Sequence, residues 1–454
     1  MSFWLTEELL APIRSTPELP GEVVDVAVIG GGITGASVAY HVSKTGASCV
    51  LLERKGISAG ATGSNGGFIA PGTSEKFGES LKRYGVEVTR TLYDYTVACT
   101  EAVAQYVEEQ QVDCELRFNG SVSLAFTDSE LAGLRSSHAM LREHGVPAEW
   151  WDAEECERRT GSGSFLGGMF KPNAGNLWPA KLVLSMALQA QAQGANLQTH
   201  TDVLRVHDPA EPGAEDEDVL VVTTSRGVVR ARHVVFCTNA WTRGLLPDLQ
   251  GVITPVRNQV IITKPLPPLW PFGLSSNHGY EYFMQRPDGR IVLGGMRDLV
   301  PSKEEDCDDE QLLNPTVSRA LRTYLPKHFP AVAAHIRNAS LSSPGGVEGE
   351  EGGPILPPLP PPLEGEGELE VEVDAEWVGI LAFTADRNPL VGPLQRLLGR
   401  GGRHRAYIAA GYTGHGMPVA FLAGRNLAEM IVGASDDPPA VPLPDAYLPQ
   451  RLGL

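Results

Sequence analysis

The chain has 454 residues, of which 42% are hydrophobic and 20% charged, and its formal net charge is −18. This composition is ordinary for a globular protein with a large core, and the negative charge disfavours nucleic acid or an anionic membrane as a partner. The six cysteines form no Cys-x-x-Cys pair, so the sequence predicts no metal site and fits a reducing compartment. The first residues lack a basic start followed by an apolar run, and a cytoplasmic location is therefore expected.

A short, continuous and β-branched run at 23–29 predicts a buried parallel strand, followed by a helix at 33–45 and a second strand at 49–53. No internal repeat is visible. Further predicted elements, in chain order, are a helix at 75–111, strands around Asn119-Gly120 at 115–127, helices at 129–144 and 182–194, strands at 195–206, 219–224, 228–238 and 256–263, a hairpin of strands at 280–285 and 290–294, a helix at 311–324, a strand at 406–410 and a helix at 417–432.

A glycine-rich turn joins the first predicted strand to the first predicted helix. Gly30, Gly32 and Gly35 have the spacing that permits a tight turn, lets a pyrophosphate approach the backbone and lets the helix pack closely on the sheet. The N-terminus of that helix offers unpaired N–H groups to phosphate. Glu53, at the end of the next strand, is placed to accept hydrogen bonds from ribose hydroxyls and to repel a 2′-phosphate. This order predicts a dinucleotide site; it disfavours NADP and does not separate FAD from NAD.

Later glycine-rich loops predict further contacts with the same dinucleotide. Segment 60–67 is a loop of small and hydroxylated residues, 234–241 is a strand that runs into a polar turn, and 411–417 joins a strand to the last helix. The N-terminus of that last helix suits a position where negative charge develops. The predicted cofactor-binding residues are Gly30, Gly32, Ile33, Thr34, Gly35, Glu53, Arg54, Ala61, Thr62, Ser64, Asn65, Gly66, Gly67, Val203, Thr238, Asn239, Ala240, Trp241, Gly411, Gly414, His415, Gly416 and Met417.

Eight blocks of sequence carry a resemblance to a known family. They are DVAVIGGGITG, LLERKGISAGATGSNGG, KPNAGNLWPAKLV, VVFCTNAW, PVRNQV, QRPDGRIVLGGMRD, WVGILAFTADRNPLVG and AAGYTGHGMPVA, and they extend from Asp25 to about Ile431. The chain resembles the D-amino-acid oxidase-like family of FAD-dependent oxidoreductases, which includes glycine oxidase and sarcosine oxidase. The GATGSNGG block is most similar to the γ-glutamylputrescine oxidase-like branch.

The resemblance implies a mixed α/β fold, with a Rossmann-like FAD-binding domain on a parallel sheet and an interleaved substrate domain with a large antiparallel sheet. The predicted boundaries are 1–21 for a lead-in, 22–85, 166–250 and 376–435 for the FAD-binding domain, 86–165 and 251–343 for the substrate domain, 344–375 for an insertion rich in Gly, Pro and Glu, and 436–454 for a C-terminal tail. The acidic runs at 304–310 and 348–376 are interpreted as solvated surface loops.

The resemblance also implies the chemistry. A hydride passes from a C–H bond next to nitrogen to flavin N5, and the resulting imine hydrolyses to an aldehyde or keto acid. The implied substrate is a small primary or secondary amine, and the implied acceptor is O2, reduced to H2O2. The amine reacts in its neutral form, which an apolar pocket favours by desolvation.

Several positions depart from the patterns of individual family members. Glycine oxidase-like members hold the substrate carboxylate with an Arg where Leu381 stands, and monomeric sarcosine oxidase has an oxygen-activating Lys where Val292 stands. Members that attach FAD covalently use a Cys at the position of Gly379 or a His at the position of Asn65. The sequence therefore favours noncovalent FAD and weakens the case for a simple α-amino acid as substrate.

Four residues are candidates for the substrate pocket. Strand alternation places Tyr282 and Arg286 on one face, with Tyr282 a candidate to cover the substrate and Arg286 a candidate carboxylate clamp. Phe383 is a candidate wall, and His415 lies in the last glycine turn with its backbone N–H as the expected contact. Each has a structural interpretation as well: core aromatics for Tyr282 and Phe383, and a turn anchor for Arg286.

Three alternatives to an amine oxidoreductase stay open. One is an amino-acid oxidase or dehydrogenase that binds the carboxylate through Arg286 or Arg297. Another is an NAD-dependent dehydrogenase, in which the later glycine-rich blocks have no role. The last is a protein that binds FAD without catalysis and contacts a partner through the acidic, Pro-rich insertion. The sequence fixes neither the substrate nor the oligomeric state.

Overall fold

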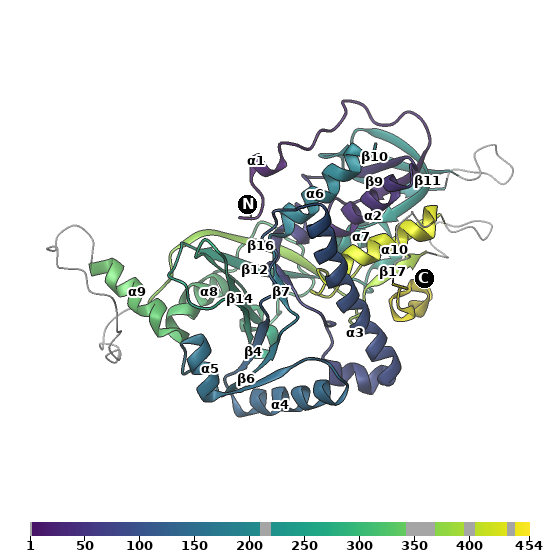
Figure 1. Ribbon diagram of the computed structural model, residues 1–454. Coiled ribbons are helices and arrows are strands. Elements are labelled where there is room, and N and C mark those ends of the chain that lie inside the picture. Colours follow the sequence, from purple (N-terminus) through teal and green to yellow (C-terminus); the bar gives the residue numbers. More distant parts are fainter. Residues whose placement is uncertain (1, 209–218, 342–367, 395–404, 434–440) are drawn as a thin grey trace.

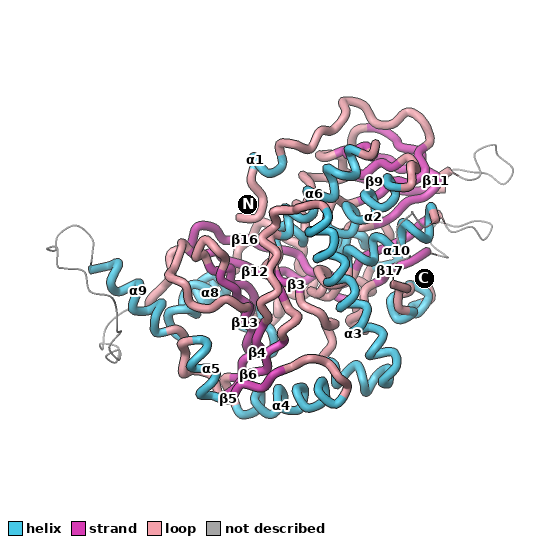
Figure 2. Tube along the Cα trace, in the orientation of Figure 1, coloured by secondary structure: helices cyan, strands magenta, loops and turns pink. Residues whose placement is uncertain are grey.

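The structure is a computed structural model that describes residues 2–208, 219–341, 368–394, 405–433 and 441–454 (Figure 1). Helices surround two separate eight-stranded sheets, and the secondary structure can be followed along the chain in Figure 2. Most of the predicted insertion at 344–375 lies outside the described residues. Within the described ranges, no helix has the length and apolar character that a membrane span requires.

The first sheet is mainly parallel. In spatial order it contains β17 (Leu390–Pro393), β18 (Ala406–Ala410), β11 (Gly227–Phe236), β1 (Val24–Ile29), β2 (Cys49–Leu52) and β8 (Asn196–Gln198), with β10 (Leu220–Thr224) and β9 (Val203–His207) attached to β11 as an antiparallel extension. Because β1 pairs in parallel with both β11 and β2, the carboxyl ends of these three strands meet at one edge. Ligands of open parallel sheets bind at such an edge.

Helix α2 (Ile33–Lys44) packs against this sheet between α6 (Pro179–Ala192) and α10 (Ala420–Val432), as Figure 1 shows. The apolar side chains of β1 and β2 are buried on both faces, which explains why these strands are continuous hydrophobic runs. The long helix α3 (Phe77–Glu109) bends at Gly85, whose φ is 77°. Its later turns contact α10, where Tyr95 Oη donates to Asn426 Oδ1 at 2.7 Å.

The second sheet is antiparallel except for one pair, β13 and β4. Its order is β16 (Val373–Phe383), β12 (Thr254–Thr263), β15 (Ile291–Gly295), β14 (Glu281–Gln285), β13 (Gly273–Ser276), β4 (Ser121–Ala125), β6 (Gly167–Lys171) and β5 (Glu149–Asp152). The helices around it are α4 (Asp128–Glu143), α5 (Ala153–Thr160), α8 (Pro315–His328) and α9 (Pro330–Leu341) (Figure 1). The predicted mixed α/β fold, with one parallel and one large antiparallel sheet, is confirmed.

Short elements complete the described chain. They are α1 (Glu7–Leu10), α7 (Thr242–Leu245), the two-stranded ladder of β3 (Phe68–Ile69) and β7 (Gly175–Asn176), and the 3-10 turns η1 (Ala61–Ser64), η2 (Asn239–Trp241), η3 (Pro247–Leu249), η4 (Asn277–Gly279), η5 (Arg297–Leu299), η6 (Asp445–Tyr447) and η7 (Pro449–Leu452). Several of these turns follow strands of the first sheet and approach the edge where β1 ends.

The structure differs from the sequence predictions in several places; for example, the strand predicted at 195–206 is two strands, β8 and β9, and α5, α9, β5 and β17 were not predicted. Two other differences share one cause. The strands predicted around Asn119-Gly120 reduce to β4, because the Gly120 N–H donates to Ala174 O and Arg117 bridges to Asn176 instead. β6 and β16 hydrogen-bond within the second sheet, although the predicted boundaries 166–250 and 376–435 grouped them with the FAD-binding domain. Pairing between distant strands determines both the extent of β4 and the sheet that contains β6 and β16, and the local sequence pattern does not encode such pairing. The domain division as a whole stays a prediction.

Candidate functional site

A cavity of about 420 Å³ opens at the carboxyl end of β1. Its volume lies within the range of roughly 300–1,000 Å³ that is usual for cofactor and ligand sites. Segments that are distant in the sequence line it: 29–34, 52–55, 201–204, 237–241 and 380–382 among others. The turns that follow parallel strands therefore converge at the position where an open α/β sheet binds its ligand.

Most of the predicted cofactor-binding residues line this cavity. They are Gly30, Gly32, Ile33, Thr34, Glu53, Arg54, Ala61, Thr62, Asn65, Val203, Thr238, Asn239, Ala240, Trp241, Gly414, Gly416 and Met417. The lining does not include Gly35, Ser64, Gly66, Gly67, Gly411 and His415. Several of those six support the walls; the Gly411 N–H, for example, donates to Asn239 Oδ1 at 3.0 Å and holds that side chain. The lining also contains residues that sequence reasoning missed, including Lys55, Asp202, Glu310 and Tyr412.

The glycine turn after β1 has the backbone that its spacing predicts. Gly30 has φ 105°, a conformation that favours glycine. A Cβ at Gly35 would overlap the carbonyl oxygen of Gly30, so only glycine lets α2 approach the end of β1 this closely. Gly32 is the N-cap of α2 and has no side chain of its own; the Ile33 N–H donates to Thr62 Oγ1 at 3.1 Å, and residues 32–34 of this turn line the cavity. A helix N-terminus of this kind is a binding site for phosphate.

Glu53 is held by backbone donors from both sides. Its Oε2 accepts from the Gly31 N–H and its Oε1 accepts from the Lys55 N–H, each at 2.7 Å. Desolvation raises the pKa of Glu53, while these two hydrogen bonds and the charges of Arg54 and Lys55 lower it. The carboxylate is therefore fixed in orientation at the cavity wall, in the position predicted for a ribose contact.

A cluster of charges next to Glu53 contradicts the surface interpretation of the acidic run at 304–310. Glu310 lines the cavity and forms ion pairs with Arg54, at 3.1 Å, and with Lys55. The Arg54 guanidinium lies 4.0 Å from the centre of the Trp241 ring. Glu304 is buried and paired with Arg257. Two acids of this run therefore have partners inside the fold, which charge density alone does not reveal.

Two tryptophans from distant segments hold the second glycine-rich loop, which is the segment 60–67. Trp377 Nε1 donates to Ser64 O at 3.0 Å, and Trp4 Nε1 donates to Asn65 O at 2.7 Å. The Asn65 side chain closes the loop from within, because it donates to Thr62 O and accepts from the Gly67 N–H. Trp4 is fully buried, so the predicted irregular lead-in contains an anchor. The adjacent aromatic residues Phe3 and Trp4 were the available signal.

Tyr282 occupies the space that two glycines leave open. A Cβ at Gly66 would overlap its ring, and a Cβ at Gly294 would lie 2.5 Å from its hydroxyl oxygen. The hydroxyl accepts from Asn258 Nδ2 at 2.7 Å. Desolvation raises the pKa of Tyr282 to about 12, against the effect of the Asn258 hydrogen bond. Tyr282 therefore remains protonated at neutral pH, beside the loop whose Asn65 lines the cavity.

Two of the pocket candidates have other roles. Arg286 is buried, pairs with Glu115 and Asp288 at 3.2 Å each, and lies 4.6 Å from the Trp178 ring centre. It anchors a turn and does not line the cavity, and its candidate role as a carboxylate clamp stays a prediction. The His415 N–H, expected to face the cofactor, instead donates to Tyr412 O at 2.9 Å. Phe383 ends β16, one residue beyond the lining residue Ala382.

A family model described as FAD dependent oxidoreductase, the DAO family, matches residues 25–430. The chain belongs to this family. The match covers the glycine turn, the later segments 60–67, 234–241 and 411–417, and the strands of both sheets from residue 25 onward, so the resemblance found in the sequence blocks is confirmed.

Relatives within the DAO family align over most of the chain. Gamma-glutamylputrescine oxidoreductase of Escherichia coli K12 is 26% identical over 91% of this chain and 84% of its own length. Glycine oxidase of Bacillus licheniformis is 25% identical over 90% of this chain and 93% of its own. The crystal structure of glycine oxidase from Geobacillus kaustophilus superposes with a TM-score of 0.70 at 19% identity, covering 94% of this chain and 98% of that one.

FAD is the cofactor of the DAO family, and the cavity fits it. The glycine turn and the N-terminus of α2, which lines the cavity, suit a pyrophosphate, and the fixed Glu53 carboxylate suits ribose hydroxyls. The cavity continues past the later turns to β16, so it has space for the second half of a dinucleotide. Within the described residues, no group of three or more His, Cys, Asp or Glu side chains is arranged to hold a metal ion.

Proposed function

We propose that this DAO-family protein oxidises the C–N bond of a primary or secondary amine, giving an imine that hydrolyses to an aldehyde or keto acid. The names of its relatives support this reaction class, since gamma-glutamylputrescine oxidoreductase and glycine oxidase each name an amine or an amino acid. The observation that carries the proposal is one continuous cavity, which runs from the glycine turn after β1 to Leu381 on the second sheet.

The residues proposed to hold FAD are those that line the cavity at the carboxyl ends of the first sheet. Bound FAD supplies the acceptor for a hydride from the carbon next to the substrate nitrogen. Gly32 and the first turn of α2 would hold the phosphates, and Glu53 would accept hydrogen bonds from the adenosine ribose. Asn65, Gly414 and Gly416 line the far part of the cavity, where the ring system is proposed to lie.

Noncovalent attachment is part of the proposal. Residue 379 is a glycine, and a Cβ there would lie 2.9 Å from Ser64 Cβ, so the position has no room for a reactive side chain. The Asn65 side chain is an amide engaged in two hydrogen bonds within its own loop. Neither residue supplies a nucleophile that forms a bond to the flavin.

On the substrate side, apolar and aromatic side chains exclude water. Leu381 lines the cavity, Phe383 follows on the same strand, and Tyr282 lies beside the second glycine-rich loop. Such surroundings lower the pKa of a bound ammonium group by desolvation and favour the neutral amine that reacts. O2 is the proposed acceptor, on the basis that several relatives are named as oxidases.

An anaerobic screen of amines tests this function. The holoprotein is mixed with primary, secondary and amino-acid amines without O2, and the flavin absorbance is followed. Bleaching by at least one class, with H2O2 formed when air is admitted, is the expected result. Flavin that is bleached but stays reduced in air would support the reaction and replace O2 with another acceptor. Unchanged flavin absorbance across the panel would contradict the proposed function.

A further inference from the structure

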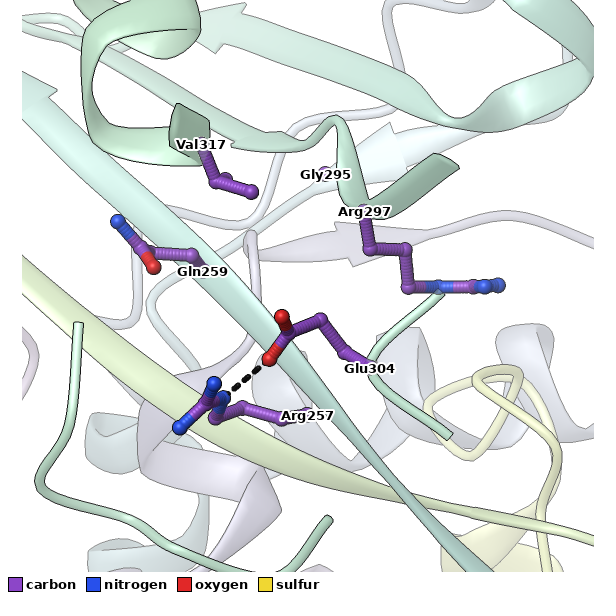
Figure 3. A pocket seen from close by; sticks show the side chains of 6 residues that line it. All are labelled: Arg257, Gln259, Gly295, Arg297, Glu304 and Val317. Atoms are coloured by element: carbon purple, nitrogen blue, oxygen red, sulfur yellow. Dashed lines mark hydrogen bonds and ion pairs between the residues drawn. The ribbon is translucent and has the colours of Figure 1, made fainter. Parts of the chain in front are cut away.

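Residues 304–310, here named the acidic strap, lead from the second sheet to the cavity at the end of β1. The first residue of the strap, Glu304, is buried and forms an ion pair with Arg257 on β12, which Figure 3 shows. Its side chain also accepts from Asn314 Nδ2 at 2.8 Å, and its carbonyl oxygen accepts from the Arg257 N–H at 3.0 Å. These contacts fix the start of the acidic strap on the second sheet.

The middle of the acidic strap is held less firmly. Arg243 on α7 pairs with Asp306 at 2.9 Å and with Asp308 at 3.1 Å. The two acidic side chains are 78% and 50% exposed, and exposed ion pairs contribute little to stability. The backbone there is also strained, since Lys303, Glu304 and Asp306 have φ between 50° and 59°. The contacts of the middle part are therefore broken at a low cost in free energy.

The last residue of the acidic strap reaches the wall of the cavity. Glu310 lines the cavity and pairs with two other lining residues, Arg54 at 3.1 Å and Lys55. These two cations directly follow Glu53, the residue proposed to bind the adenosine ribose. The Arg54 guanidinium also lies 4.0 Å from the ring centre of Trp241, which lines the cavity as well. The strap therefore joins the second sheet to the adenosine end of the proposed FAD site.

Electrostatic attraction to FAD does not explain an acid at this position. The phosphates of FAD are negatively charged, and a carboxylate in the cavity wall repels them. Glu310 does, however, join two segments that are 255 residues apart in the chain, across the wall of the cavity. Its ion pairs are contacts between parts of the protein, so their effect is on the opening of the site and not on attraction of the cofactor.

We propose that the acidic strap is an ionic latch that controls the exchange of FAD. The ion pairs of Glu310 with Arg54 and Lys55 open when FAD enters or leaves, and the buried pair of Glu304 with Arg257 keeps the strap attached to the second sheet. This role concerns cofactor exchange, and it holds whichever amine the protein oxidises.

Stopped-flow measurements of FAD exchange test the proposal without any amine. Entry is measured by mixing apoprotein with FAD, and release by mixing holoprotein with an excess of a competing apoflavoprotein, with flavin fluorescence as the signal. The variant is Glu310→Gln. The matched control is Glu368→Gln, which removes the same charge from an exposed ion pair with Arg319. Release is also measured as NaCl is raised from about 0.05 M to about 0.5 M, which screens partly exposed ion pairs.

The latch predicts that Glu310→Gln raises the entry rate and the release rate together, by about threefold to tenfold, and changes the Kd for FAD little. NaCl accelerates release from the wild type more than from Glu310→Gln, and Glu368→Gln behaves as the wild type does. Slower release from Glu310→Gln would overturn the proposal, because it would mean that Glu310 only repels FAD. Faster release at an unchanged entry rate would make Glu310 a binding contact and would also overturn the latch, as would unchanged rates or a protein that takes up no FAD.

Discussion

The Glu53 carboxylate accepts a 2.7 Å hydrogen bond from the Gly31 N–H and thereby ties the end of β2 to the glycine turn that follows β1. Its other oxygen accepts from the Lys55 N–H at the same distance. A carboxylate keeps further lone pairs after two such bonds, so Glu53 is able to orient the loops and still accept from ribose hydroxyls. Glu53 therefore holds the two loops together, in addition to its predicted role in binding the ribose.

Glu53→Gln is expected to weaken FAD binding. A glutamine accepts at only one of the two positions and turns an N–H donor toward the other backbone N–H, which costs about 1–3 kcal/mol. The expected result is roughly a tenfold to hundredfold rise in the Kd, measured by titrating the apoprotein with FAD and following flavin fluorescence. Glu149→Gln, at an exposed position of β5, is the control. Full retention of colour through dialysis would show that the ribose contact is misplaced.

Gly35→Ala is expected to destabilise the glycine turn severely. The added Cβ meets the Gly30 carbonyl oxygen, a backbone atom that cannot move without shifting β1. Overpacking of this kind costs about 3 kcal/mol or more, and the variant should lose FAD and melt earlier. Gly133→Ala in α4 is the matched control, since no neighbour lies within 4 Å of its added Cβ. Equal melting temperatures and FAD contents for the two variants would contradict the tight packing of α2 on β1.

Trp4→Ala is expected to release FAD faster while the rest of the fold survives. Trp4 is fully buried, and its indole N–H holds Asn65 O in the second glycine-rich loop. Its removal frees that loop, whereas the Trp178 indole keeps its acceptor, because Trp4 O is a backbone atom. Stopped-flow displacement of FAD measures the off-rate, with the exposed Leu312→Ala as control. An off-rate equal to that of the wild type would show that the N-terminal anchor does not support the site.

Glu281 is expected to make the stability depend on pH. Desolvation raises the pKa of this buried carboxyl from 4.5 to about 7, against hydrogen bonds from Asn277 and Ser276. Between these pH values the unfolded chain ionises before the folded one, so stability falls as pH rises, by about 3 kcal/mol in total above pH 7. Denaturant unfolding of the wild type at pH 5 and pH 8 should show this loss, and Glu281→Gln should lack it. A variant with the same pH dependence as the wild type would exclude Glu281 as its source.

Tyr282→Phe is expected to weaken binding of the amine substrate and to leave FAD binding unchanged. The hydroxyl accepts from Asn258 Nδ2, and its removal leaves that donor without its partner in the pocket. We expect about a tenfold higher Kd for the substrate, measured from the concentration dependence of flavin reduction, with normal FAD content. Because the pKa of Tyr282 is raised to about 12, wild-type pH profiles between pH 6 and 10 should contain no tyrosine ionisation. Loss of FAD in this variant would instead assign Tyr282 to the cofactor-binding loop.

The dinucleotide site was largely predictable because its determinants are local in the sequence. Gly30, Gly32 and Gly35 specify their turn by spacing alone, and Glu53 follows at the end of the next strand. The remaining wall residues depend on pairing between distant segments. Glu310 reaches Arg54 and Lys55 across 256 and 255 residues of chain, and no local pattern distinguishes it from the solvated acids beside it.

The substrate side was less predictable for the same physical reason. Strand alternation placed Arg286 and Tyr282 on one face, yet it did not reveal that Glu115 and Asp288 neutralise Arg286. The same holds for Arg297, whose guanidinium lies against the rings of Tyr280 and Phe383, while Glu304 pairs with Arg257. Which charges remain unpaired is a property of the folded chain.

The central claim is that the separate glycine-rich turns surround a single FAD. The direct measurement is to purify the protein under mild conditions, precipitate it with acid and quantify the flavin in the supernatant. The account predicts a yellow protein that releases close to one equivalent of FAD and leaves a colourless pellet. A colourless protein that does not take up added FAD would contradict the account, and flavin retained in the pellet would contradict noncovalent binding.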